Sequence, residues 1–407
     1  MDDTIPTTAP RGLLAATLVA QMAFGLLAMT ICLPSMQEWG AIFGAGAARV
    51  QLTFSGYVLT YGALQLVYGP LSDRHGRKPL LLIGMALAGA ASLAAAFAPS
   101  MAWLVAARLV QGAGAAACMV VGRAAVQDLF QGPERTRVMA YVGMAMGLCP
   151  PTATVLGGQL HVRLGWQSNF VLLAVLAVLL FTLAWRVLPN RPATIAPGTH
   201  WLHEMAAAYA RLARERAFVL NVVIISATGG AFYAFLGGAP LVLKNYGVGP
   251  GEVGFYIMIA PLSYIVGNYI ATRIVLRTGE RWMATAGQAS TIAGIAIVVV
   301  LALAGLHTPM AFAAPLVLMG IGHGLLVPPT LAATVGLVPA LAGAAAAIAG
   351  VTQQLTGAFG GHAVGWLSHH DAAPLGVLML AFTLCAAAAQ AVLFARVSPA
   401  GPRPRRA

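Results

Sequence analysis

The chain has 407 residues, of which 59% are hydrophobic and only 8% are charged, and its formal net charge is +12. Soluble domains carry about 25% charged residues, so this composition excludes a soluble protein and indicates an integral membrane protein. The excess of Lys and Arg could also indicate nucleic-acid binding, but the apolar segments leave no domain to carry a basic groove. We therefore expect the lipid bilayer, and no nucleic acid, around most of the chain.

Twelve apolar segments of about twenty residues fill most of the chain, and each is long enough to cross a membrane as a helix. They lie at 13–37, 51–70, 80–98, 102–127, 138–158, 168–188, 219–242, 253–274, 283–305, 310–334, 343–366 and 374–396. The N-terminus lacks a basic stretch and a small-residue cleavage site, so we expect the first segment to be retained. The sequence thus predicts an all-α integral membrane protein with twelve transmembrane helices.

The basic residues are distributed unevenly between the loops. Most of the 23 Lys and Arg residues lie on the side of the N-terminus, whereas only Arg49, Arg163 and Lys244 lie in the opposite loops. This asymmetry follows the positive-inside rule, in which cytoplasmic loops carry the excess of Lys and Arg. It predicts that both termini are cytoplasmic.

The longest polar interruption, at 189–217, divides the chain near its midpoint. We expect an N-terminal six-helix bundle at 1–188, a cytoplasmic linker at 189–217 and a C-terminal six-helix bundle at 218–407. Within the linker, apolar residues at helical spacing predict an amphipathic helix. These residues are Trp201, Leu202, Met205, Tyr209 and Leu212. The helix is expected to lie against the inner leaflet, with a regulatory docking site as the alternative.

The two halves repeat with an offset of about 203 residues. Gly76, which follows the second segment, corresponds to Gly279, which follows the eighth. The same offset relates glycines of the fifth segment to glycines of the eleventh, namely Gly147, Gly157 and Gly158 to Gly350, Gly360 and Gly361. Parallel repeats of this kind imply a substrate cavity between the halves near the midplane of the membrane.

A charged turn, with the sequence GPLSDRHGRKP at 69–79, lies between the second and third segments. Gly69 allows a close approach to another helix, such as the eleventh segment. Asp73 and Arg77 lie where these helices meet the cytoplasm, and Asp128, at the end of the fourth segment, is a second acid for Arg77. Such a charge cluster can hold one conformation closed until a proton or substrate changes the balance. The alternative is a topological anchor that only keeps the loop inside.

These residues resemble the Major Facilitator Superfamily along essentially the whole chain. The turn at 69–79 matches the loop motif of that superfamily between spans two and three. The segments 51–53, 108–114 and 123–130 are similar to the bicyclomycin and chloramphenicol resistance branch of twelve-span drug/proton antiporters. The resemblance implies two pseudo-symmetric six-helix bundles and alternating access, without enzymatic activity or a cofactor. It also implies a monomer in the bacterial inner membrane that is driven by the proton gradient.

The gating residues that the motif and the repeat predict are Gly69, Asp73, Arg74, Gly76, Arg77, Asp128, Gly157 and Gly158. In the fifth span the antiporter signature is only partly present, because the prolines are displaced to Pro150 and Pro151. Glycine and proline there still allow close packing and bending of the helix. We therefore expect export, with proton-linked import of a small metabolite as the alternative.

Arg108 lies inside the fourth span, where an arginine costs about 2.5–3.5 kcal/mol at mid-helix. In the resembled antiporters the corresponding arginine belongs to the proton and substrate region, often with an acid in span one, but this chain has Thr30 there. Among its eleven acids none lies deep in a span, so the proton site stays open. Glu38, His323 and His362 are candidates, since histidine exchanges a proton near neutral pH. Alternatively, Glu38 is only a solvated acid at a helix end, and His323 and His362 only pack the core. The proton would then be coupled through the cytoplasmic acids Asp73 and Asp128.

The absence of deep carboxylates argues against a strongly cationic substrate and favours a neutral, zwitterionic or anionic amphiphile. An antibiotic or a secreted natural product such as a siderophore fits this description, with Arg108 as an anion partner. Polar residues in the spans that would line the cavity are Gln21, Tyr57, Tyr61, Gln65, Asn221, Tyr233, Asn268, Gln353 and Gln354.

Metal and enzyme sites have little support in the sequence. The four cysteines lie in apolar segments without a CxxC spacing, which predicts neither a disulfide nor a metal site. His369, His370 and Asp371 are the one cluster that an integral-membrane enzyme could use, and three loop residues are too few for one. A receptor without transport would need a signalling domain or an extended tail, and only a short basic end, 400–407, follows the last segment.

Overall fold

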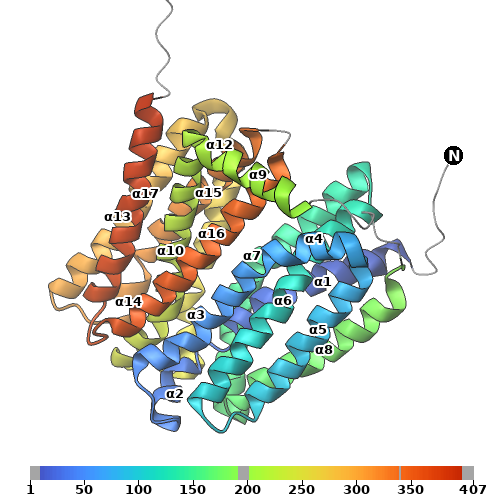
Figure 1. Ribbon diagram of the computed structural model, residues 1–407. Coiled ribbons are helices and arrows are strands. Elements are labelled where there is room, and N and C mark those ends of the chain that lie inside the picture. Colours follow the sequence, from blue (N-terminus) through green and yellow to red (C-terminus); the bar gives the residue numbers. More distant parts are fainter. Residues whose placement is uncertain (1–9, 191–200, 339–340, 397–407) are drawn as a thin grey trace, which may run out of the picture.

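The structure is a computed structural model, and it describes residues 10–190, 201–338 and 341–396. In this part of the chain the regular structure is helical, and the helices form two groups that lie side by side (Figure 1). The first group contains α1 (Arg11–Thr30), α2 (Met36–Ile42), α3 (Ala47–Ala63), α4 (Gln65–His75), α5 (Arg77–Ala96), α6 (Met101–Leu129), α7 (Gly132–Leu164) and α8 (Gln167–Val187).

The second group follows the linker helix α9 (Trp201–Arg214). It contains α10 (Arg216–Asn245), α11 (Pro250–Ile257), α12 (Ile259–Thr278), α13 (Glu280–Leu303), α14 (Pro309–Ala313), α15 (Leu316–Gly336), α16 (Ala342–Ala363), the short 3₁₀ helix η2 (Val364–Trp366) and α17 (Ala373–Arg396). We call the two groups the first half and the second half. Their opposite ends are called the α2 end and the α9 end, after the short helices that lie there (Figure 1).

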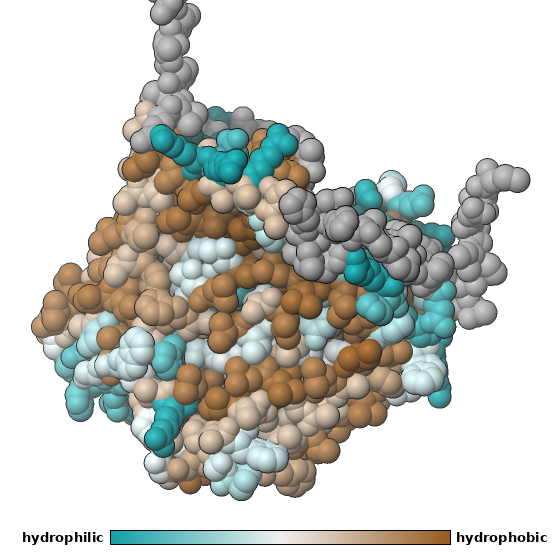
Figure 2. Space-filling model, in the orientation of Figure 1, coloured by the Kyte–Doolittle hydropathy of each residue, from teal (hydrophilic) through white to brown (hydrophobic). Residues whose placement is uncertain are grey.

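These helices make twelve membrane-crossing segments, as the sequence predicts. Ten helical stretches in the described part are long and apolar enough to cross a membrane. The other two crossings are α3 with α4, which break at Leu64, and α16, which carries polar residues such as Gln353 and Gln354. Hydrophobic residues cover the middle of the visible face in Figure 2, and hydrophilic residues gather toward its two ends. This distribution suits a surface that faces lipid.

Several helix boundaries differ from the sequence prediction. The first span ends at Thr30 instead of continuing to residue 37, because the chain turns before Pro34 and starts the separate helix α2. The fifth span is longer than predicted, since α7 continues through polar residues to Leu164. The eighth span breaks at Met258, and the tenth at Pro315, which has no amide hydrogen to continue the helix.

The linker helix α9 packs against the second half at the α9 end. Leu212 is fully buried there among Phe218 and Val222 of α10 and Ala345 and Ala349 of α16. The sequence predicts Leu212 on the apolar stripe of this helix, and burial against protein accounts for it at this position. Residues 191–200 of the linker lie outside the described residues.

Two pairs of glycines show that the internal repeat extends to the backbone conformation. Gly76 and Gly279 have φ of +87° and +78° at the starts of α5 and α13, and Gly44 and Gly247 have φ of +59° and +81° after the first crossing of each half. Only glycine adopts such angles without steric cost. The loops at these two places therefore have the same geometry in both halves.

Candidate functional site

A cavity of about 880 Å³ lies between the two halves. Its walls come from α1 and α7 of the first half and from α10, α12, α15 and α16 of the second half. This volume is near the upper end of the range for pockets that enclose small molecules, about 300–1,000 Å³. The cavity is therefore large enough for an antibiotic-sized ligand.

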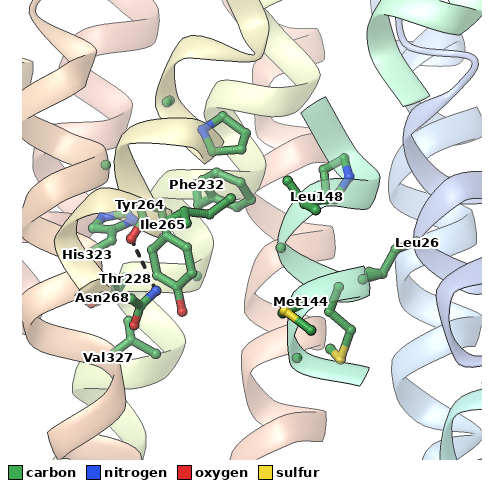
Figure 3. Close-up of a pocket in the computed structure, with 18 of the residues that line it drawn as sticks. Leu26, Met144, Leu148, Thr228, Phe232, Tyr264, Ile265, Asn268, His323 and Val327 are labelled. Atoms are coloured by element: carbon green, nitrogen blue, oxygen red, sulfur yellow. Dashed lines mark hydrogen bonds between the residues drawn. The ribbon is translucent and has the colours of Figure 1, made fainter. Parts of the chain in front are cut away.

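The two walls of the cavity differ in chemistry (Figure 3). The first half contributes apolar residues and glycines, among them Leu26, Met29, Met144, Met146, Leu148 and Pro150. All the polar side chains come from the second half, namely Thr228, Tyr233, Tyr264, Asn268, His323 and Gln353. Within the described chain no Asp, Glu, Lys or Arg lines this cavity. The site thus offers one flexible apolar wall and one wall of uncharged hydrogen-bonding groups.

His323 is the one ionisable side chain, apart from the two tyrosines, among the residues that line this cavity. It lies on α15, is only 4% exposed, and packs edge-on against the ring of Phe232 at 6.3 Å between centroids. Its Nε2 atom has no hydrogen-bond partner among the described residues. An unpaired buried nitrogen costs free energy unless a ligand, a water or a proton satisfies it. His323 can therefore hydrogen-bond a substrate or bind a proton.

Three of the polar residues that the sequence proposes for the substrate line the cavity: Tyr233, Asn268 and Gln353. Gln354 lies behind this wall, where its Oε1 accepts a hydrogen bond from the Tyr233 hydroxyl at 2.7 Å. Tyr264 also lines the cavity and was missed. The repeat could have found it, because the offset of about 203 residues relates Tyr264 to the candidate Tyr61.

Arg108 lies outside the cavity, in the core of the first half, with no measurable exposure. Its Nε atom donates to the carbonyl oxygen of Thr53 at 3.0 Å, and its Nη1 atom donates to that of Ala28 at 2.8 Å and to Oε1 of Gln111. The guanidinium also lies 4.3 Å from the ring centre of Tyr57. Arg108 therefore ties α1 and α3 to α6, and backbone carbonyls take the place of the acid that a buried arginine usually needs.

Three more substrate or proton candidates also lie outside the cavity. Thr30 is buried and donates to the carbonyl of Leu26 at 2.8 Å, and the hydroxyl of Tyr57 donates to the carbonyl of Gly25 at 2.7 Å. Tyr61 stacks on Tyr57 at 5.9 Å between ring centroids. These side chains pack the first half and do not reach the cavity in this conformation.

The charged turn forms an ion-pair cluster within the first half. Arg77, at the start of α5, contacts Oδ1 of Asp73 at 2.5 Å and Oδ2 of Asp128 at 2.9 Å. It also donates to the hydroxyl of Ser72 at 2.5 Å. The cluster therefore joins the ends of α4 and α6 to α5 at the α9 end. Arg74 lies beside it in the last turn of α4.

Gly69 does not meet the eleventh span, contrary to the expectation from the sequence. Only Val120 of α6 lies within 4 Å of the position that a Cβ atom would take at Gly69. The reason is that the halves pack most closely toward the α2 end, where Phe54 of α3 contacts Gly361 of α16.

Comparison with known proteins identifies the family. The model of the Major Facilitator Superfamily matches residues 13–361, which is most of the chain. The chain belongs to the Major Facilitator Superfamily. It is 29% identical to a chloramphenicol resistance protein of Pseudomonas aeruginosa over 76% of this chain and 74% of that protein. It is 33% identical to multidrug resistance protein D of Escherichia coli K12 over 46% of this chain and 47% of that protein.

Solved structures agree with this membership at the level of the fold. A bacterial homologue of the human lysosomal transporter Spinster, in an inward-facing and unoccupied conformation, has a TM-score of 0.74 and 15% identity. It covers 96% of this chain, and this chain covers 97% of it. A D-xylose-proton symporter has a TM-score of 0.73 at 15% identity, over 92% of this chain and 97% of its own. The chain is thus a membrane-spanning transporter of this superfamily.

The two halves of this superfamily member close against each other at the α2 end. Gln37 of α2 donates to the carbonyls of Pro240 at 2.7 Å and Val248 at 3.3 Å, and Gln51 of α3 donates to that of Gly237 at 2.7 Å. Further hydrogen bonds cross from Lys244 to the carbonyl of Gln37 and from Gln159 to that of Gly251. The sequence does not predict these contacts, because backbone carbonyls as partners leave no signal in it.

The predicted gating glycines of α7 lie at this closure. A methyl group at Gly157 would overlap the carbonyl oxygen of Ile31, and one at Gly158 would overlap that of Pro250 in the second half. The absence of side chains therefore brings α7 into direct contact with the backbone of α11. In the repeat, Gly361 of α16 also faces the other half, with the ring of Phe54 of α3 lying 3.0 Å from the position that a Cβ atom would take.

Glu38 takes part in a polar network at the same end and not in a contact with Arg108. Its Oε2 atom lies 2.9 Å from Nε2 of His161, whose Nδ1 lies 2.9 Å from the Ser35 hydroxyl. Asn169 donates to that hydroxyl at 3.1 Å. His161 was missed because α7 continues past the predicted end of the fifth span. The network fastens the turn between α1 and α2 to α7.

Proposed function

We propose that this transporter exports a small, uncharged or weakly charged amphiphilic molecule in exchange for protons. The charge-free cavity between the halves carries this proposal. A strongly charged substrate would need a buried counter-charge, because an unpaired ion in a low-dielectric site is costly. The methionine-containing wall suits the apolar side of such a molecule, and the opposite wall suits its carbonyl, hydroxyl or amide groups. An antibiotic, or a natural product such as a siderophore in neutral form, has this character.

The direction of transport rests on the relatives. The matched protein of Pseudomonas aeruginosa is named for resistance to chloramphenicol. Those of Haemophilus influenzae and Escherichia coli are named for resistance to bicyclomycin and to several drugs. Resistance to an antibiotic that acts inside the cell is consistent with export. We place the protein in the bacterial inner membrane with the α9 end and both termini in the cytoplasm, as the basic loops suggest.

We assign the coupled proton to His323. Apart from the tyrosines it is the one side chain in the cavity wall that can gain or lose a proton, and a group in the cavity is exposed to each side in turn as the halves rock. In this scheme a proton enters from outside, and the substrate that arrives from the cytoplasm displaces it. One proton that moves through 100 mV provides about 2.3 kcal/mol. That energy can maintain a concentration ratio of roughly fifty, and no cofactor is needed.

Inverted membrane vesicles test the proposal directly. With an inside-acid proton gradient, added chloramphenicol should accumulate in vesicles that contain the protein and should dissipate the gradient in proportion. His323→Gln should lose the proton flux, whereas the loop variant His370→Gln should keep it. Accumulation that needs no gradient, or proton flux that survives in His323→Gln, would contradict the coupling. Substrate movement into right-side-out vesicles together with protons would support the alternative, a proton-linked importer.

A further inference from the structure

A second cavity, of about 290 Å³, lies inside the second half at the α9 end. Residues of α10, α13, α15 and α17 line it, and no residue of the first half does. Its volume is close to the lower limit for small-molecule pockets, about 300 Å³. It is therefore separate from the cavity between the halves and suited to a smaller ligand.

The internal repeat shows why this space exists. In the first half the corresponding interior is filled by Leu14, Leu18 and Leu81, each of which is at most 2% exposed. About 203 residues later, the equivalent positions hold Ala217, Asn221 and Ala284, and all three line the cavity. Three leucines are thus replaced by two alanines and one amide. The cavity is a departure from the packing of the duplicated half, where large apolar side chains fill the same place.

Two buried amide side chains line this space. Asn221 and Gln390 are each 5% exposed and line the cavity. The Nε2 atom of Gln390 has no hydrogen-bond partner among the described residues. A buried donor that stays unpaired costs about 1–3 kcal/mol. Gln390 thus brings an unpaired donor to the wall of the cavity, where an acceptor could pair with it.

The mouth of the cavity is formed by the exposed residues Glu280 and Arg281 at the start of α13. Arg281 donates to the carbonyl of Phe394 at 2.5 Å, and its guanidinium lies 4.6 Å from the centre of that ring. A guanidinium has five N–H donors, so it can bind a further acceptor. Both α10 and α13 begin here, and the partial positive charge at the start of a helix favours an anion.

We propose that this cavity is a second ligand site, which binds a small molecule with a carboxylate group from the α9 side. The carboxylate accepts hydrogen bonds from Gln390 and Arg281, and the apolar part packs against Ile224, Leu393 and Phe394. The proposal does not depend on the direction of transport or on the exported substrate. Because the site lies among four helices of one half, its ligand fixes the internal packing of that half and does not cross the membrane by this route.

Binding of benzoate to the purified full-length protein tests this site, with benzyl alcohol as the neutral counterpart of similar shape. Saturation-transfer NMR should show saturable benzoate binding and at least about tenfold weaker binding of benzyl alcohol, since hydrogen bonds to charged groups are the stronger ones. Equal binding of the two compounds would contradict the carboxylate assignment. Benzoate binding that does not saturate would show that water alone fills the cavity and would overturn the proposal.

Substitutions in the cavity show where benzoate binds, and the melting temperature shows whether each variant is still folded. Arg281→Gln should weaken benzoate binding about tenfold, and Glu280→Gln should strengthen it, because Glu280 repels the carboxylate. Asn221→Leu restores the side chain of the first half and should abolish binding while the melting temperature is retained. Lys78→Gln, at the repeat position of Arg281, is the matched control and should have no effect. Unchanged binding in both Arg281→Gln and Asn221→Leu would overturn the site.

Discussion

Arg77 links three helices of the first half through side chains of opposite charge. Arg77→Gln removes its contacts with both Asp73 and Asp128, whereas Asp73→Asn removes only one. Partly exposed ion pairs contribute up to about 1 kcal/mol each, so we expect a modest loss of stability. We expect a larger loss of transport, because in the gating hypothesis the cluster shapes the loop that meets the second half when the α9 end closes.

Transport rates in vesicles, compared at equal protein abundance, measure this effect. The expected order is wild type, then Asp73→Asn, then Arg77→Gln with the lowest rate. Arg137→Gln, which removes a cation from the first turns of α7 at the same end, is the control and should transport normally. Full transport by Arg77→Gln would contradict the gating role and would show that the turn acts only as a topological anchor.

Arg108 stabilises the first half through backbone carbonyls and does not contact the cavity. Arg108→Lys keeps the charge but loses the planar fork that reaches Thr53 and Ala28 together. At least one buried carbonyl should lose its partner, at a cost of about 1–3 kcal/mol. The melting temperature of the purified protein should fall, while the folded fraction keeps its substrate affinity. Unchanged melting with abolished transport would instead assign Arg108 to the substrate or the proton.

The contrast between Arg77 and Arg108 shows how far the sequence predicts a site. The pairing of Arg77 with Asp128 was predictable, because Asp128 lies at the end of the fourth segment on the same side of the membrane as the turn, and opposite charges attract. The contacts of Arg108 were not predictable, since any residue supplies a carbonyl and only the fold decides which ones are near. The role of His323 was only partly predictable from the sequence. Its depth was evident from the sequence, but its position in the cavity wall depends on how α15 is rotated.

At the scale of helices, hydropathy predicted the number and order of the membrane crossings but not their interruptions. The break at Leu64 has no proline within five residues, whereas the break at Met258 comes three residues before Pro261, whose ring lacks an amide hydrogen and crowds the carbonyl of Ile257. The long continuation of α7 also escaped prediction, because its polar ends project beyond the apolar core of a bilayer. Apolar length identifies a crossing, whereas the contacts of each helix determine where it bends or ends.

The contact between α7 and α11 makes a prediction about conformation. Gly158→Ala places a methyl group against the carbonyl of Pro250, so it should push the halves apart at the α2 end and favour the opposite conformation. Accessibility of single cysteines at that end to a membrane-impermeant thiol reagent measures the change. Gly143→Ala on the same helix is the control, because nothing lies within 4 Å of its Cβ position. Equal labelling of both variants would show that this contact does not control closure.

At the scale of the whole molecule, the two halves are closed against each other at the α2 end, as one of the two states of the proposed alternating access would require. The closure at the α2 end combines side-chain amides and the Lys244 ammonium, which bind backbone carbonyls across the two halves, with the glycine contact of α7. The charged cluster of Arg77 lies at the opposite end and makes its ion pairs within the first half. Hydrogen bonds of this kind can be exchanged for water at little cost, which suits a contact that must break in every transport cycle.

The glutamines of this closure should set the balance between the two states. Gln37→Leu and Gln51→Leu each remove hydrogen bonds worth about 1 kcal/mol net, which corresponds to about a fivefold shift toward the state open at the α2 end. Spin labels at Ala41→Cys and Glu252→Cys, in a background without the native cysteines, report the separation of the halves there. Each leucine variant should increase the population with the longer distance, and the double variant should increase it further. Gln131→Leu at the opposite end should leave the distances unchanged. If the double variant keeps the short distance, packing of the glycines alone holds the closure, and the amide contacts only follow it.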